Sequence, residues 1–157
     1  MNETILVIIV ISIILYFYYN TRPVVKEHFI IINIKEKLCL LNKHFEKLDI
    51  REGSSSYTED KSTIYLCLRD ERGNYYSQNT VMYVVLHEIA HILNKDNYGH
   101  TPEFHAIFNK LLCRAADIGI YDPHQPHDDW YCGVDISQIE MPKCNILDDV
   151  PIENIAL

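Results

Sequence analysis

One apolar stretch constrains the fold of this chain more than any other feature. The sequence "VMYVVLHEIAHIL", from Val81 to Leu93, is apolar on almost every face of a helix but contains two histidines and a glutamate. A helix that is apolar all round lies buried in the middle of a domain. Because unpartnered buried polar groups are costly, His87, Glu88 and His91 need partners there. The stretch therefore predicts a central helix that carries a polar site.

The spacing of these three residues is typical of a catalytic metal site. Residues four apart on a helix lie one above the other, with Cβ atoms about 5–6 Å apart, so His87 and His91 can both point at one ion. Zinc binds imidazole nitrogens in this way, and a catalytic zinc ion keeps one position open for water. Glu88 lies about 100° further around the helix, where we expect it to act as the general base for that water. The alternative is two core histidines paired with backbone carbonyl groups.

The neighbouring segments predict an α+β fold around this helix. Apolar residues recur at helical spacing over residues 25–48, and residues 63–69 are β-branched and aromatic, which favours a strand. That strand could be an edge strand that pairs with an extended substrate, or an internal strand. Asn79 or Thr80 is expected to cap the central helix, which ends near Asn94. Thr101 and Gly119 are expected to begin and end a further helix over residues 102–117.

Three residues after the central helix could supply a third metal ligand. Glu103 lies in the first turn of the following helix, His100 lies just before that helix, and His105 lies one turn inside it. Spacing alone leaves the choice among them open.

The motifs "HEIAH" and "GHTPEF" make the region from Ile64 to Ile118 similar to the WLM and SprT-like zinc metallopeptidases. The resemblance is strongest to uncharacterised WLM-like proteins of large DNA viruses, many of which carry an N-terminal hydrophobic span. It implies a compact zincin-like domain that hydrolyses peptide bonds, with His100 as the third zinc ligand and Phe104 as the aromatic residue that packs the helix start against the core. The chain differs from the nuclear members of the family because it lacks a basic DNA-binding extension.

The N-terminal segment predicts a single transmembrane helix. The eighteen residues from Thr4 to Thr21 carry no charge and include "ILVIIVISIILYFYY". As a helix they would span about 27 Å, close to the about 30 Å of a bilayer core. A cleaved signal peptide would need a positive start and a small-residue cleavage site, which this segment lacks. Arg22 and Lys26 follow the span, so we expect the main domain to face the cytosol.

The net charge and the cysteines indicate which partners and which redox compartment to expect for the domain. The formal net charge is −8 and no basic stripe is present, so no direct nucleic-acid partner is expected. The five cysteines are odd in number and lack C-x-x-C spacing. This pattern favours free thiols in a reducing compartment over a disulfide framework.

Weaker candidates lie around the site. Tyr83 is four residues before His87 and could touch the metal site, although a core tyrosine is the simpler interpretation. Either Tyr121 or Tyr131 could stabilise an oxyanion.

A second metal site is also conceivable in "PHQPHDD". It would use His124, His127 and Asp128, although histidines in proline-rich loops are commonly solvated.

Together these observations predict three parts: a membrane anchor over residues 1–22, a zincin-like domain over residues 23–125, and an irregular tail over residues 126–157 packed on the domain. The predicted function is a membrane-anchored zinc metallopeptidase acting on a protein or peptide substrate. The alternative is a membrane-tethered structural or adaptor protein in which zinc only holds the fold.

Overall fold

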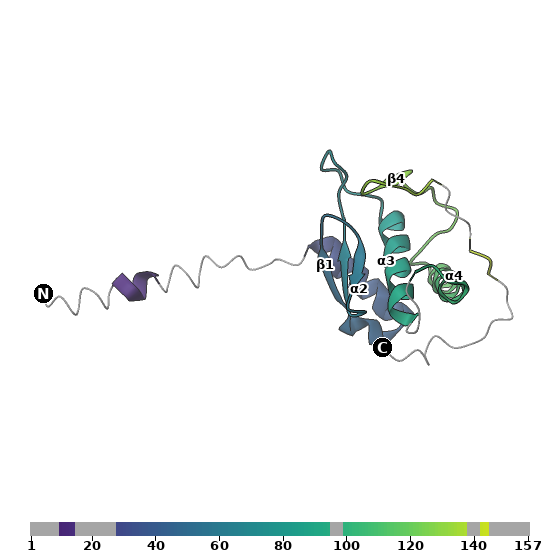
Figure 1. The fold of residues 1–157 in the computed structure, drawn as a ribbon, viewed down its shortest axis with the longest axis horizontal. Coiled ribbons are helices and arrows are strands. Elements are labelled where there is room, and N and C mark those ends of the chain that lie inside the picture. The colour runs from purple at the N-terminus through teal and green to yellow at the C-terminus, as the bar shows by residue number, and fades with distance from the viewer. Residues whose placement is uncertain (1–9, 15–27, 95–98, 138–141, 145–157) are drawn as a thin grey trace, which may run out of the picture.

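The computed structural model describes residues 10–14, 28–94, 99–137 and 142–144. Figure 1 shows a mixed α+β arrangement in which a small sheet, the helix α3 and the helix α4 lie one beside the next. The N-terminal elements are the helix α2 (Phe29–Leu41) and the short 3-10 helix η1 (Lys43–Lys47). The predicted helix over residues 25–48 is therefore two elements. The first helix ends before Asn42, because the backbone of Asn42 is extended. The Asn42 side chain accepts the His44 N–H at 2.9 Å and so caps the second element.

The sheet contains three short strands, β1 (Asp49–Glu52), β2 (Tyr57–Glu59) and β3 (Thr63–Leu66), in the order β1-β3-β2. β1 runs parallel to β3 and β2 runs antiparallel to it. The strand expected over residues 63–69 is thus the internal strand β3, and the edge strand beside α3 is β2. β1 and β2 were not predicted, because one buried position in β1 and none in β2 leaves no alternating apolar pattern.

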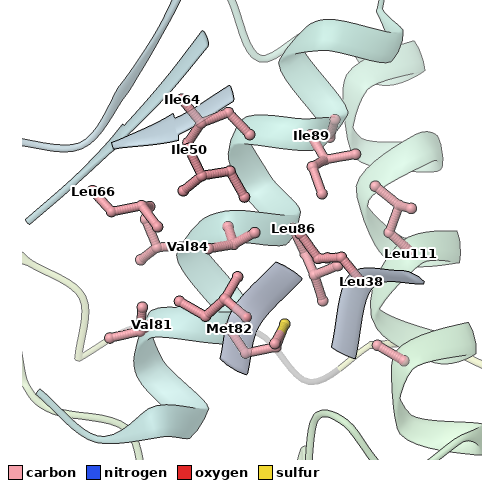
Figure 2. Packing of buried hydrophobic residues seen from close by; sticks show 14 of the residues in the cluster. Leu38, Ile50, Ile64, Leu66, Val81, Met82, Val84, Leu86, Ile89 and Leu111 are labelled. Atoms are coloured by element: carbon pink, nitrogen blue, oxygen red, sulfur yellow. The ribbon is translucent and has the colours of Figure 1, made fainter. Parts of the chain in front are cut away.

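The helix α3 (Gln78–Leu93) lies at the centre of the fold, as its composition predicted. Figure 2 shows its side chains packing toward the sheet at Ile50 and Ile64 on one side and toward Leu111 of α4 on the other. Twelve of its sixteen residues are buried, which confirms that its apolar faces are covered all round. The actual N-cap is Ser77, whose side chain accepts the Thr80 N–H, rather than Asn79 or Thr80.

The helix α4 (Pro102–Asp117) has the predicted ends. Thr101 caps it by accepting the Phe104 N–H, and Pro102 occupies the first turn. Gly119 follows with φ of 74°, a conformation that suits glycine after a helix. Local signals were sufficient here because each acts on the residues beside it.

The described part of the tail is more ordered than the irregular packing that was expected. It contains the two-residue strands β4 (Trp130–Tyr131) and β5 (Val134–Asp135), which pair antiparallel. Tyr131 is buried in the main core.

The N-terminal prediction rests mostly on residues 1–9 and 15–22, which lie outside the described residues. Within the described part, Val10–Ile14 is helical and its side chains are exposed. None of the described helices has the length and apolar character needed to cross a bilayer.

Candidate metal centre

Three histidines from two adjacent elements converge on one point. His87 and His91 lie one turn apart on α3, and His100 lies directly before the N-cap of α4. The Nε2 atom of His87 is 3.2 Å from that of His91 and 3.0 Å from that of His100. One ring nitrogen from each histidine lies within 4.8 Å of the others, so the group could hold a metal ion.

Two of the three distances among these nitrogens fit a shared tetrahedral ion. Two nitrogens that each bind zinc at about 2.0–2.1 Å lie about 3.3 Å apart when the geometry is tetrahedral. The two short separations around His87 are close to that value. Three imidazole donors leave one tetrahedral position without a protein ligand.

Burial keeps His87 and His91 in the neutral form that binds metal. Desolvation, followed by the neighbouring charges of His91 and His100, lowers the pKa of His87 to about 3. Desolvation also lowers the pKa of His91, again with a contribution from His100. Neutral rings at neutral pH present lone pairs rather than protons, as metal ligands must.

Phe104 forms the support behind the triad. It is fully buried in the first turn of α4, as the resemblance implied, and its ring centroid lies 4.4 Å from that of His91 and 4.7 Å from that of His100. The same ring meets His87 edge-on at 4.9 Å. Phe104 therefore restricts the orientation of all three imidazoles.

Glu88 lies beside the triad in a largely dry environment. Its exposed fraction is 7%, and Oε2 accepts a hydrogen bond from the hydroxyl of Thr58 at 2.8 Å. Burial raises the pKa of Glu88, and the Thr58 hydrogen bond partly offsets this rise by stabilising the carboxylate. Thr58 belongs to the edge strand β2, so the sheet positions the carboxylate. No sequence signal pointed to Thr58.

Glu88 lines two hollows of different character. One has a volume of about 830 Å³, is lined mainly by apolar side chains, and is bordered by His87, His100 and Tyr83. The other, of about 740 Å³, is bordered by His91, Lys61 and more polar side chains. Glu88 therefore faces cavities of both kinds.

The other candidate ligands do not join the triad. His105 is exposed, with its ring centroid 6.1 Å from that of His100, and Glu103 is also outside the group. Tyr83 lines the apolar hollow and packs edge-on against Phe108.

The proposed second metal site is not formed among the residues that the structure describes, where the histidine triad is the one group of this kind. Nε2 of His127 lies 3.0 Å from the Tyr121 hydroxyl, and the Asp128 carboxylate accepts the Ser77 N–H. These side chains hold the loop after α4 against the start of α3.

Both tyrosines proposed as oxyanion donors are engaged elsewhere. The Tyr121 hydroxyl lies against His127, and burial raises the pKa of Tyr121 to about 12. The Tyr131 hydroxyl donates to the Cys67 carbonyl at 2.6 Å. Neither geometry offers a free donor to the metal centre.

The cysteines contradict the expectation of free thiols. Cys67 pairs with Cys132 and Cys113 pairs with Cys144, which leaves Cys39 as a free cysteine. The partners are 65 and 31 residues apart in the sequence, so only the folded chain brings them together. This removes cysteine usage as an argument for a reducing compartment.

The chain is similar to uncharacterised proteins of three large DNA viruses. It is 40% identical over 100 residues to the uncharacterised protein 136R of Invertebrate iridescent virus 6, covering 60% of this chain and 56% of that protein. It is 47% identical over 91 residues to the uncharacterised protein 042R of Invertebrate iridescent virus 3, covering 57% of each chain. An uncharacterised protein of Acanthamoeba polyphaga mimivirus is 35% identical over 106 residues, covering 62% of this chain and 53% of that protein.

The chain thus spans about half the length of the relatives it matches. No protein-family model matches it, and no solved structure matches it. Its homologues are uncharacterised proteins of large DNA viruses.

Proposed function

We propose that this protein is a zinc-dependent metallopeptidase of the WLM or SprT-like kind. The observation that supports it best is a buried glutamate that lines two hollows beside three convergent imidazoles. Three protein donors are typical of catalytic zinc, whereas structural zinc sites are closed by four.

Each residue has a distinct proposed role. His87, His91 and His100 would hold the ion, and Phe104 would keep their rings aligned. A bound zinc ion would supply a Lewis acid that polarises the substrate carbonyl and acidifies a water molecule. Glu88 would take up a proton and return it to the leaving amine. Since Thr58 occupies Oε2, Oε1 is the atom proposed to carry that proton.

The edge strand offers a way to align a peptide. β2 pairs with β3 on one side, and its Thr58 reaches Glu88. An extended peptide that pairs with β2 would gain backbone hydrogen bonds without any sequence requirement.

Metal analysis and cleavage by the Glu88→Gln variant test the proposal. The full chain should bind one zinc ion and cleave members of a mixed peptide library. Glu88→Gln keeps the size of the side chain but removes the base, so zinc content should be unchanged while kcat/KM falls by about 10²–10⁴-fold. Undiminished cleavage by the variant, or a protein that binds no zinc, would contradict the proposal.

Inhibition separates the enzyme from a structural or adaptor protein. A small hydroxamate should bind the zinc-loaded chain and block cleavage, because an open metal position accepts an external ligand. A closed structural site would keep its zinc and ignore the hydroxamate.

We also propose that residues 4–21 anchor the domain to a membrane, on the basis of their uncharged, apolar sequence. Arg22 and Lys26 favour a domain on the cytosolic side, whereas the two disulfides favour an oxidising compartment. Carbonate extraction of membranes tests the anchor, and protease protection of the domain in sealed vesicles tests the side.

A further inference from the structure

The outer wall of the apolar hollow is a tail segment that is tied to the body of the protein at two places. The segment comprises Cys132–Ile136 and Pro142–Cys144, and we call it the tethered wall. Most of its residues line the hollow beside His87 and Glu88. Figure 1 shows the first part of this segment next to β4 and residues 142–144 beside α4.

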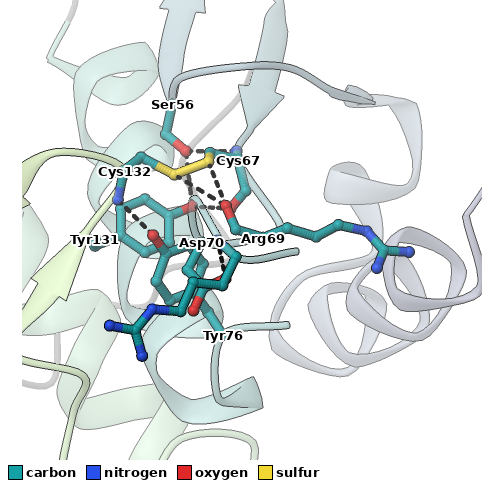
Figure 3. Close-up of a disulfide and its surroundings, with 8 residues drawn as sticks. Ser56, Cys67, Arg69, Asp70, Tyr76, Tyr131 and Cys132 are labelled. Carbon is teal, nitrogen blue, oxygen red and sulfur yellow. Dashed lines mark hydrogen bonds between the residues drawn. A yellow bond between two sulfur atoms is a disulfide. The ribbon is translucent and has the colours of Figure 1, made fainter. Parts of the chain in front are cut away.

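The first tether joins the wall to the end of β3. The Cys67–Cys132 disulfide is flanked by a closed set of hydrogen bonds, drawn in Figure 3. The Cys67 N–H donates to Ser56 Oγ at 2.9 Å, the Ser56 and Tyr131 hydroxyls lie 2.8 Å apart, and Tyr131 donates to the Cys67 carbonyl. Because every group in the set has a partner, the wall has a defined position at this end.

The second tether joins the wall to α4. Asn109 and Cys113 lie four residues apart and so face the same way on the helix. The Asn109 side chain donates to the Lys143 carbonyl at 3.0 Å and accepts the Lys143 N–H at 2.7 Å. Cys113 forms the disulfide with the next wall residue, Cys144.

The interior of the hollow is suited to apolar groups. Val84, Phe108 and Leu112 line it from the two helices, and Val134 and Ile136 line it from the tethered wall. Val134 has an exposed fraction of 58%, so apolar surface is available at the rim. By contrast, the hollow on the other side of Glu88 is bordered by Asp60 and Lys61.

Together, these contacts show an apolar pocket whose far side is held by long-range covalent bonds. We propose that this pocket binds one large apolar side chain of the substrate next to the cleaved bond, and that the two disulfides make it selective by holding the tethered wall in place. The proposal rests on the proposed peptidase function and names the substrate class of that site. The strands β4 and β5 have two residues each, too little pairing to hold the wall without the tethers.

Paired peptides test the selectivity. Two series that differ only by Gly, Ala, Leu or Phe on either side of the cleaved bond should show one position at which Leu or Phe raises kcat/KM about 10–100-fold over Ala, since each buried methylene adds several-fold. The Ala106→Phe variant should reduce this preference, because residue 106 lines the same hollow from the exposed face of α4. Equal cleavage of Ala, Leu and Phe peptides at both positions would overturn the pocket.

Cysteine variants test the role of the wall. In the double variant Cys113→Ser/Cys144→Ser, the ratio of kcat/KM for Leu or Phe peptides to that for Ala peptides should fall about tenfold, because the wall no longer has a fixed position. Asn109→Ala should move in the same direction. Cys39→Ser is the matched control, because Cys39 is a free thiol on α2 and should leave the preference unchanged. An unchanged preference in the double variant would overturn the role of the wall.

Hydroxamate binding keeps this test separate from the peptidase proposal. The zinc-loaded chain should bind a benzyl-bearing hydroxamate about 10–100-fold more tightly than the methyl-bearing compound, whether or not any peptide is cleaved. Absence of peptide cleavage together with this affinity difference would count against the peptidase and support the pocket. Equal affinities, or no binding of either compound, would overturn the pocket.

Discussion

The histidine triad and the tethered wall border the same hollow, yet they are built in different ways. The triad comes from a stretch of fourteen residues, His87 to His100, and depends on one helix turn and one short connection. The wall depends on pairs of cysteines that are 65 and 31 residues apart. The chemistry of the site is therefore encoded by local spacing, whereas the shape of the cavity is set by long-range contacts.

Removing one member of the triad should have the largest effect. His100→Ala should weaken zinc binding by more than the about 100-fold that is typical when an outer partner of a metal ligand is lost. His105→Ala is the matched control, since His105 is exposed on the next turn and outside the triad. Competition with a zinc-binding dye measures the zinc affinity of both variants. Similar losses of affinity in the two variants would contradict the assignment of His100 as a ligand.

The Cys113–Cys144 disulfide of the tethered wall should raise the free energy of unfolding without changing zinc affinity. A bond that closes a loop of 31 residues should stabilise the fold by about 3–4 kcal/mol through the entropy of the unfolded chain. Chemical denaturation of Cys113→Ser/Cys144→Ser against Cys39→Ser measures this difference, with zinc affinity expected to stay the same. A loss of zinc in the double variant would show that the two regions are coupled.

The same contrast explains how much could be predicted from sequence. The ends of α4 follow from Thr101, Pro102 and Gly119, and α3 follows from its apolar composition, because these signals act within one helix. The helix expected over residues 25–48 was wrong in its length, since Asn42 interrupts it by capping the next turn.

Residues placed by tertiary contacts could not be predicted. Thr58 reaches Glu88 across 30 positions, and β2 carries no apolar pattern that would have marked it as a strand. Free cysteines were expected from their odd number and their spacing, but cysteines that pair only in the folded chain leave no spacing pattern in the sequence.

Tyr131→Phe tests whether the first tether affects stability without affecting the histidine triad. The change removes one hydroxyl, leaves the Cys67 carbonyl buried without that partner, and should destabilise the fold by about 1–3 kcal/mol. Zinc affinity should be unaffected, because Tyr131 contacts the wall and the end of β3 rather than the triad. Denaturation and metal titration on the same preparation provide the two measurements.

Thr58→Val should have the smallest effect and tests the hydrogen bond between the sheet and the Glu88 carboxylate. The variant keeps the shape of the side chain but removes the hydrogen bond to Oε2 of Glu88. A single hydrogen bond of about 1 kcal/mol corresponds to about a fivefold fall in kcat/KM, with zinc content unchanged. Thr58→Ser retains the hydroxyl and should retain most of the activity. If Thr58→Val and Thr58→Ser have the same kcat/KM, the hydroxyl does not position Glu88. The carboxylate would then be held by the packing of α3 alone.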